Sequence, residues 1–326
     1  MRSVKVFLMG ALLIASSVAW AQKVGLLMDS YVIERWRTDQ TLFTEKIQSL
    51  GGKVLVEVPH GNPDEQVKLG KKLLASGIDV LVIVPTDAQK AIAIVEAAKA
   101  ANIPVLSYDR LIPTKDVSLY ISYDGTKVGR LQAQYAKDKV PAGNYMLING
   151  PKSDNNSIMF RNGQMDVIQS EIKSGKINVI ADFILDDWSE LEAIMKVEEF
   201  LSNNSVRPDV IIAANDALAT GALQVLPRDL AAKIVITGQD AERMALRNIV
   251  AGQQSMTVYK PIKPLAYQAA EAAMKLAKKQ PVGATKMKYG DIEVNAILLD
   301  PIVVDKTNYK DTIVKDGHLS MSEINN

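Results

Sequence analysis

Side chains that can exchange hydrogen bonds with hydroxyl groups recur along this chain, most of them shortly after a run of β-forming apolar residues. Carboxylates, guanidinium groups and ammonium groups form charge-assisted hydrogen bonds, which are about twice as strong as bonds between neutral groups. Amides both donate and accept, as a hydroxyl group does. The set comprises Arg35, Trp36, Asp109, Arg110, Asn155, Asn156, Trp188, Asn215, Asp240 and Lys260.

Most of these residues stand where a predicted strand ends and a loop or helix begins. In open α/β sheets, ligands bind outside the carboxyl ends of the strands. The positions therefore predict that the side chains converge on one cleft. Planar hydrogen-bonding groups together with indoles suit a polyhydroxylated ligand that has one apolar face, as a sugar does.

Each residue also has a purely structural interpretation. Asp109 and Arg110 could form a surface ion pair or cap a helix. Asn215 and Asp240 precede predicted helices, where Asn and Asp are common N-caps. Lys260 could be a solvated loop lysine. The shared position at strand ends is what favours a common site over separate structural roles.

Two of the three tryptophans fall within the predicted fold. Trp36 and Trp188 lie in opposite halves of the chain, each beside charged residues. A core indole usually has apolar neighbours in sequence, so both are predicted to be loop aromatics at a surface or cleft. Two facing indoles could hold the apolar faces of a sugar ring between them, and the alternative is partly exposed packing of each ring.

Catalytic signatures are missing from the sequence. It contains no GxSxG, HExxH, GxGxxG or GxxxxGK[ST] motif. The lack of cysteine excludes thiolate nucleophiles, disulfides and Cys-type zinc sites. His60 and His318 are expected to be surface residues, and cleft carboxylates alone are weak support for glycoside hydrolysis. We therefore predict a binding protein and not an enzyme, with no cofactor and no metal.

The first 21 residues are predicted to be an export signal that is not part of the fold. Arg2 and Lys5 give a positive start, residues 6–15 an apolar core, and residues 19–21 a small-x-small cleavage site. The apolar run is shorter than the roughly 20 residues that span a bilayer. The alternative is a buried N-terminal strand or helix.

Charge argues against a nucleic-acid partner. Removing the predicted signal, which carries two basic and no acidic residues, takes the formal charge from +1 to −1. A nearly neutral chain without a basic block lacks the electrostatic footprint of nucleic-acid-binding proteins.

The rest of the chain alternates strand and helix patterns in two series. The first has strands at 23–28, 53–58, 80–84 and 104–108 and helices at 37–50, 64–75 and 87–101; the second has strands at 144–148, 177–184, 210–213 and 234–237 and helices at 157–174, 191–203, 217–226 and 242–250. Alternation of this kind predicts doubly wound parallel sheets with right-handed crossovers. Two series predict two similar α/β lobes.

Later elements indicate that the chain crosses between the lobes more than once. A strand at 255–259 leads into an Ala-rich helix, and a Pro- and Gly-dense loop at 281–290 precedes strand-like pieces such as 297–299. Crossings near 123–124, 260–261 and 290 would form a three-segment hinge. We accordingly assign residues 22–123 and 261–290 to an N-terminal lobe, and residues 124–260 and 291–326 to a C-terminal lobe.

Taken together, the sequence resembles the periplasmic sugar-binding proteins of ABC transporters, in the ribose/galactose-binding group of type I periplasmic binding proteins. The resemblance covers essentially the whole chain after residue 21. YDR, NDA and GQD are shared with other pentose and hexose binders and with sugar-sensing repressors, whereas ERW, DNN and TVYKP point to xylose binders. The segments are ERW at 34–36, YDRLI at 108–112, YISYDGTKVGRLQAQ at 120–134, DNN at 154–156, FRNGQM at 160–165, ANDA at 214–217, GQDA at 238–241 and MTVYKPI at 256–262.

The resemblance implies a two-lobed clamshell that closes on a monosaccharide, D-xylose favoured, and delivers it to an inner-membrane ABC permease. It also implies a periplasmic location and a monomer. Trp36, Asp109 and Arg110 would line one lobe, Asn155 or Asn156, Trp188, Asn215 and Asp240 the other, and Lys260 the hinge. Arg37 and Thr38 depart from the lysine expected two places after the tryptophan, so either Arg35 or Arg37 could supply the basic contact of the first loop.

Other functions stay open at this point. The chain could bind a different pentose or hexose, such as ribose or arabinose, although Met159 stands where ribose binders tend to place an arginine. It could also be a sugar-sensing module for a chemotaxis or sensor-kinase receptor. A repressor of the same fold would need a helix-turn-helix where the export signal stands, and a periplasmic hydrolase would turn its sugar over.

Overall fold

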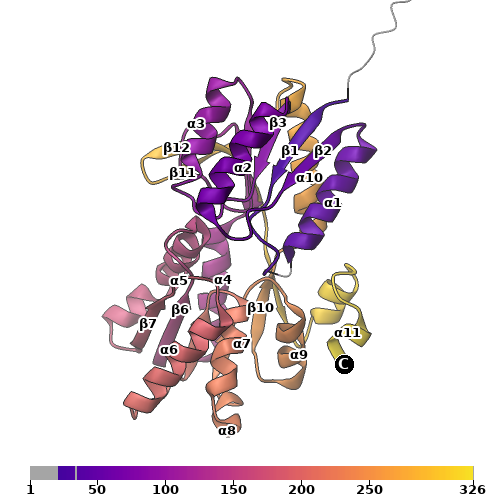
Figure 1. Ribbon diagram of the computed structural model, residues 1–326. Helices are drawn as coiled ribbons and strands as arrows, with labels where there is room; N and C mark the ends of the chain where they lie inside the picture. The colour runs from indigo at the N-terminus through magenta and orange to yellow at the C-terminus, as the bar shows by residue number, and fades with distance from the viewer. Residues whose placement is uncertain (1–20, 34, 326) are drawn as a thin grey trace, which may run out of the picture.

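Two α/β lobes, stacked one above the other, make up the computed structural model, which describes residues 21–33 and 35–325 (Figure 1). The predicted export signal therefore lies outside the described residues except for Ala21, as does Glu34 of the ERW segment. In the described part of the chain, no helix has the length and apolar character needed to cross a membrane.

A seven-stranded sheet with the order β11-β12-β5-β4-β3-β1-β2 forms the centre of the N-terminal lobe. All its neighbouring strands are parallel except β11, which runs antiparallel to β12. The strands are β1 (Lys23–Leu27), β2 (Lys53–Glu57), β3 (Val80–Ile83), β4 (Val105–Tyr108), β5 (Leu119–Tyr123), β11 (Thr285–Tyr289) and β12 (Ile292–Leu299).

Helices cover both faces of this sheet. Val80 and Val82 of β3 join the core beneath α1 (Arg35–Ser49) and α10 (Ile262–Ala277). Leu81 and Ile83 join a second core beneath α2 (Pro63–Ala75) and α3 (Ile92–Ala100). Because successive side chains of a strand point to opposite faces, a strand buried on both sides reads as the continuous apolar run seen here.

The C-terminal lobe has a four-stranded parallel sheet with the order β7-β6-β8-β9. Its strands are β6 (Gly143–Asn149), β7 (Ile177–Ile184), β8 (Val210–Ala213) and β9 (Val235–Thr237). One face is covered by α4 (Gly125–Lys139) and α5 (Asn155–Lys173), and the other by α6 (Glu190–Asn203) and α7 (Asp216–Val225).

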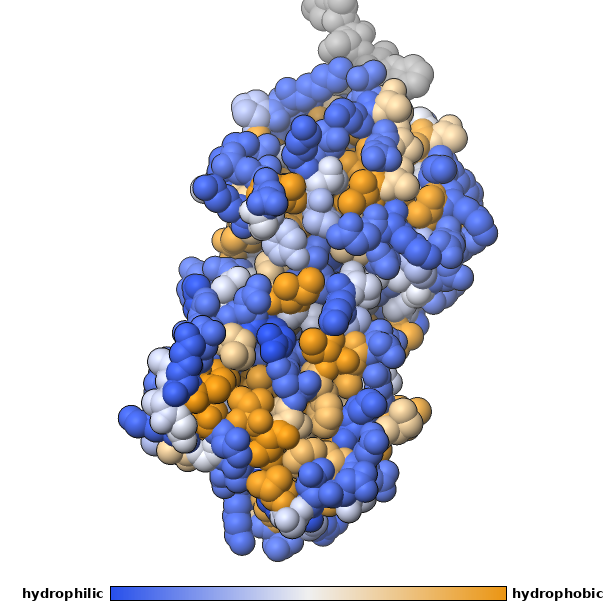
Figure 2. Space-filling view, turned by 90° about the vertical axis from the view of Figure 1, so that its left-hand side faces the viewer, coloured by the Kyte–Doolittle hydropathy of each residue, from blue (hydrophilic) through white to orange (hydrophobic). Residues whose placement is uncertain are grey.

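The remaining elements lie at the base of this lobe and at its junction with the other one. An antiparallel pair joins β10 (Met256–Tyr259) to β13 (Ile302–Asp305). The short helices are α8 (Arg228–Ala231), α9 (Arg243–Ala251), a π-helical segment (Lys310–Val314) and α11 (Met321–Asn325). Seen from the side, hydrophilic residues cover most of the N-terminal lobe, whereas apolar residues gather on the C-terminal lobe (Figure 2). Exposed apolar side chains of the latter include Ile184, Leu191 and Met195.

The structure differs from the expected division of the chain at residues 292–299. We assigned this segment to the C-terminal lobe, but β12 pairs in parallel with β5, with Ile297 opposite Ile121. Gly290, expected near a crossing, instead forms the turn of the β11–β12 hairpin with a φ of 55°. The strand stays in the N-terminal sheet because Val294 and Ala296 bury against Tyr120 of β5.

Three segments connect the lobes side by side. The chain passes from one sheet to the other after β5, between β10 and α10, and between β12 and β13. The backbone N–H of Asp124 donates to the carbonyl of Leu299 at 3.1 Å, and the hydroxyl of Tyr123 donates to the carbonyl of Pro261 at 2.7 Å. These bonds tie the three segments into one hinge.

Candidate functional site

A cavity with about 310 Å³ of space between atoms lies where the two lobes meet. Nine of the ten residues predicted from the sequence line it, all but Asn155. The lining comprises Ile33, Arg35, Trp36, Asp109, Arg110, Asp154, Asn156, Phe160, Trp188, Asn215, Gln239, Asp240 and Lys260.

Strand ends place these side chains. Asp109 directly follows β4, Lys260 follows β10, and Asn215 comes shortly after β8. Asp109 and Asp240 adopt left-handed backbone conformations, with φ of 61° and 96°. Such conformations are uncommon outside glycine, tolerated best by Asn and Asp, and concentrated at functional sites, where they aim a side chain.

Asp109 is the electrostatic centre of the cavity. Its Oδ2 accepts a hydrogen bond from Asn156 Nδ2 at 3.0 Å, and its Oδ1 lies 3.4 Å from Arg35 Nη1 and 3.6 Å from Lys260 Nζ. Burial alone would raise the pKa of Asp109, but Lys260, Arg35 and Arg110 outweigh it and lower that pKa below its ordinary value. The carboxylate is therefore ionised at neutral pH, as a strong hydrogen-bond acceptor must be.

Arg35 is held by three carboxylates. Its Nε and Nη2 contact the two oxygens of Asp39 at 3.1 and 3.2 Å, and its Nη1 lies 3.3 Å from Asp240 Oδ1. Burial would lower the pKa of Arg35, but Asp39, Asp109 and Asp240 outweigh burial and raise that pKa well above its ordinary value. Arg37, the other basic residue that the sequence left open, is exposed and lies over the ring of Tyr31.

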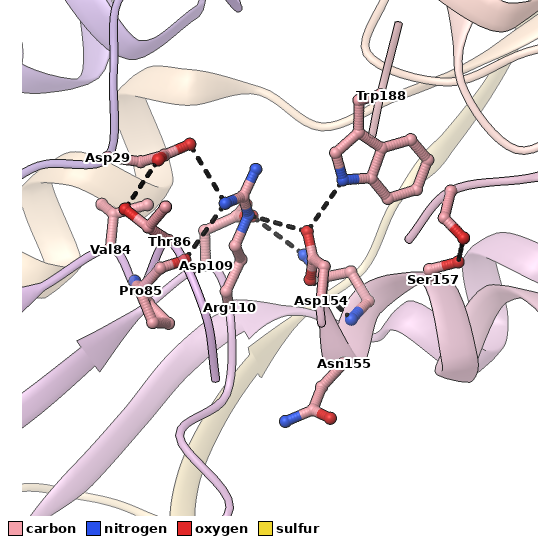
Figure 3. Close-up of polar contacts among 12 residues, drawn as sticks. Asp29, Val84, Pro85, Thr86, Asp109, Arg110, Asp154, Asn155, Ser157 and Trp188 are labelled. Atoms are coloured by element: carbon pink, nitrogen blue, oxygen red, sulfur yellow. Dashed lines mark hydrogen bonds and ion pairs between the residues drawn. The ribbon is translucent and has the colours of Figure 1, made fainter. Parts of the chain in front are cut away.

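Arg110 joins the two lobes (Figure 3). Its Nη1 donates to Asp29 Oδ2 and to the carbonyl of Pro85, both at 3.1 Å, within the N-terminal lobe. Its Nε lies 2.8 Å from Asp154 Oδ2 in the C-terminal lobe, and that oxygen also accepts the indole N–H of Trp188 at 3.0 Å. The guanidinium group is thus held by acceptors from both lobes.

Each lobe contributes one indole to the cavity wall. The guanidinium groups of Arg35 and Arg110 lie 5.0 and 5.6 Å from the ring centre of Trp36. The ring of Trp188 packs at a tilt on Phe160, 6.2 Å between centres. Trp36 differs from the expectation of a loop aromatic, because it lies in the first turn of α1 and is only 2% exposed.

Asn215 and Asp240 differ in whether they cap a helix as well as line the cavity. Asn215 does both, since its Oδ1 caps α7 by accepting the N–H of Leu218 at 2.9 Å while the residue lines the cavity. Asp240 caps no helix, and its carboxylate instead accepts from Gln239 Nε2 and pairs with Lys260 Nζ at 3.1 Å.

Several polar atoms of the lining have no hydrogen-bond partner among residues 21–33 and 35–325. They are Trp36 Nε1, Asp109 Oδ1, Asn156 Oδ1 and Gln239 Oε1. A buried polar group without a partner costs about 1–3 kcal/mol and is rare in folded proteins. Their presence around one cavity indicates a site built for a ligand that supplies both donors and acceptors.

Asn155 is the predicted residue that the structure keeps out of the cavity. Its Nδ2 donates to the carbonyl of Leu111 at 2.8 Å, and its Oδ1 accepts the hydroxyl of Tyr289 at 2.7 Å. Conversely, Ile33, Asp154, Phe160 and Gln239 line the cavity but were not among the ten predicted binding residues. All but Ile33 stand within segments already singled out, so the positions of those three carried a signal.

The described residues contain no group of three or more His, Cys, Asp or Glu side chains arranged to hold a metal ion. His60 is exposed as expected. His318 is partly exposed; its ring packs on Tyr259, and its Nε2 lies 3.0 Å from the carbonyl of Ala241.

Comparison with known proteins agrees with this architecture. A family model described as a periplasmic binding protein domain matches residues 24–281. The D-xylose-binding periplasmic proteins of Escherichia coli (strain K12) and Haemophilus influenzae are each 42% identical to this chain, over 96% and 97% of it and 96% of their own lengths. A carbohydrate transporter solute-binding protein from Chloroflexus aurantiacus, solved with D-glucose, superposes with a TM-score of 0.85 at 30% identity, covering 93% of this chain and 98% of that one. The predicted two-lobed α/β class is confirmed, and the chain belongs to the periplasmic binding protein family.

Proposed function

We propose that this protein captures a monosaccharide, D-xylose, between its lobes and delivers it to an inner-membrane ABC permease. The observation that carries this proposal is the inter-lobe cavity, whose wall combines an ionised carboxylate, three cations, amides and one indole from each lobe. The choice of D-xylose rests on the relatives that are 42% identical over nearly the whole chain and bear that name.

The lining suits the chemistry of a small sugar. Asp109 Oδ1 accepts from a sugar hydroxyl, because it is the carboxylate oxygen left without a hydrogen bond. Asn156 and Asn215 offer amide groups that match hydroxyls. Trp36 and Trp188 cover the apolar C–H faces of the ring.

Discrimination between epimers follows from the buried polar groups. A site built to bond particular hydroxyls rejects an analogue that leaves its buried donors or acceptors unpaired, by as much as about 10⁴-fold. Inverting one sugar hydroxyl would strand an atom such as Asp109 Oδ1 or Gln239 Oε1, which have no protein hydrogen-bond partner in the described chain. D-xylose should therefore bind far more tightly than its epimers.

Capture proceeds by closure about the three-segment hinge. Sugar that first meets one lobe recruits the other, because only the closed form offers contacts from both sides. The permease then recognises the closed arrangement. Export to the periplasm through the predicted signal completes this function, and N-terminal sequencing of protein recovered from that compartment should begin at Gln22; a chain beginning at Met1 would contradict it.

The test is isothermal titration of residues 22–326 with D-xylose, D-ribose, L-arabinose and D-glucose, followed by recovery of the sugar. We expect saturable one-to-one binding of D-xylose, weak or no heat from the others, and sugar returned unchanged. Tight binding of another sugar would overturn the specificity. Silence towards all of them would overturn the function, and release of a converted product would indicate an enzyme.

A further inference from the structure

Two tripeptide segments dock against each other across the lobe interface. Residues 109–111 follow β4 in the N-terminal lobe, and residues 154–156 begin α5 in the C-terminal lobe. Every residue of one segment contacts a residue of the other: Asp109 Oδ2 with Asn156 Nδ2 at 3.0 Å, Arg110 Nε with Asp154 Oδ2 at 2.8 Å, and the carbonyl of Leu111 with Asn155 Nδ2 at 2.8 Å.

The third pair differs from the other two in its position. Asp109, Arg110 and their partners line the cavity, whereas Asn155 does not. Asn155 is 3% exposed, and both ends of its amide are engaged by the N-terminal lobe, through Leu111 and through the hydroxyl of Tyr289. Its hydrogen-bonding capacity is thus directed at the opposite lobe and away from a ligand.

Tyr289 reaches Asn155 from the tip of the β11–β12 hairpin. It is the last residue of β11, and Gly290 follows it at the first of two turn positions with a φ of 55°. Type II′ hairpin turns place glycine there. Because β12 is paired with β5, the hairpin moves with the N-terminal sheet. Burial raises the pKa of Tyr289, so its hydroxyl stays a donor at neutral pH.

We propose that Asn155 and Tyr289 are positioning residues for sugar capture, which raise affinity by holding the first turn of α5 against the N-terminal lobe without touching the sugar. The contact joins parts that separate when the lobes open, so it stabilises the closed form alone. This inference rests on the proposed function, because the closed form is the one that retains sugar.

The change that isolates the contact is Tyr289→Phe, which removes one hydroxyl and leaves the hairpin and the cavity lining intact. The matched control is Tyr145→Phe, since the hydroxyl of Tyr145 donates to the carbonyl of Val140 within the C-terminal lobe. One net hydrogen bond to a neutral group corresponds to a change of about 2- to 10-fold in affinity. A cycle with Asn155→Ala tests whether both residues act through the same contact.

The readouts are D-xylose titration, solution scattering with and without D-xylose, and urea unfolding without sugar. We expect Tyr289→Phe to weaken D-xylose binding 2- to 10-fold while its sugar-free unfolding matches that of the wild type, and Tyr145→Phe to bind as the wild type does. In the Asn155→Ala background the further loss from Tyr289→Phe should disappear.

Wild-type affinity in Tyr289→Phe would overturn the inference, as would equal loss of affinity in both tyrosine variants. Failure of the proposed function is distinguishable, since the wild type itself would then bind none of the sugars. Solution scattering decides the inference in that case. A Tyr289→Phe variant that is more expanded than the wild type supports the contact as a closure element, and identical scattering profiles overturn it.

Discussion

Replacing Asp109 by asparagine should remove most of the sugar affinity while keeping the shape of the site. The amide oxygen of the new residue keeps the hydrogen bond from Asn156 Nδ2, now 3.0 Å from Asp109 Oδ2. The amide nitrogen then takes the place of Oδ1, which lies 3.4 Å from Arg35 Nη1 and 3.6 Å from Lys260 Nζ. The amide N–H donor would thus face two cations. It would also face the sugar hydroxyl whose hydrogen bond Oδ1 should accept.

The size of the effect follows from Asp109 Oδ1, the oxygen of this carboxylate that has no hydrogen bond in the described chain. A hydrogen bond to a charged group contributes about 1.5–3 kcal/mol. Each 1.4 kcal/mol is a factor of ten in affinity, so loss of this one bond predicts a weakening of about 10- to 100-fold. The buried cations add to this loss, because among the described residues Arg35 and Lys260 keep only Asp39 and Asp240 as acidic partners.

Titration of the variant with D-xylose measures this loss, and sugar-free urea unfolding reports separately whether the protein still folds. The matched control is Asp138→Asn, because Asp138 is an exposed carboxylate on α4 that accepts a hydrogen bond from Gln134 on the same helix. The control should bind D-xylose as the wild type does. Affinity of Asp109→Asn within about three-fold of the wild type, in a folded protein, would refute the assignment of Asp109 as the central acceptor.

Two further predictions concern buried charge. Burial raises the pKa of Asp109, and Lys260 is the strongest of the groups that lower it, so Lys260→Met should raise that pKa and make D-xylose affinity fall between pH 8 and pH 5. The affinity of the wild type for D-xylose should stay constant over that range. Parallel pH profiles of affinity in the two proteins would contradict the pairing of Lys260 with Asp109. Burial raises the pKa of Asp216 to about 7, above the value of about 3.9 in unfolded chains, so its stabilising effect should be lost as pH rises through 7. Urea unfolding should show that the free energy of unfolding of the wild type falls by about 3 kcal/mol relative to that of Asp216→Asn from pH 5 to pH 8. An equal pH dependence of this free energy in the two proteins would contradict the raised pKa of Asp216.

Local sequence patterns predicted much of the architecture. Apolar runs such as residues 80–84 predicted strands buried on both faces, and β3 is such a strand. The position of polar residues after these runs predicted that they would converge, and nine of the ten line one cavity. This works because parallel strands of one sheet end at the same edge, so the position along the chain determines the position in space.

The sequence alone could not predict which strand pairs with β12. Residues 297–299 read as strand-like, but nothing local specifies whether they extend the sheet of one lobe or the other. The choice depends on which sheet has a free edge with apolar residues to cover, and β5 offers that edge through Tyr120. Pairing across more than 160 residues, such as Ala296 with Tyr120, is decided by the assembled fold.

The sequence by itself determined which chemical groups meet, and only the tertiary structure decided which atoms face the cavity. A helix turns about 100° per residue, so neighbours in its first turn point in different directions. Arg35 and Arg37, two places apart on α1, lie on opposite sides, and Arg35 alone of the two lines the cavity. Likewise Asn156 lines it, while Asn155 is directed to Tyr289. The start and orientation of each helix are fixed by packing against the sheets, and that packing selects among residues that the sequence leaves equivalent.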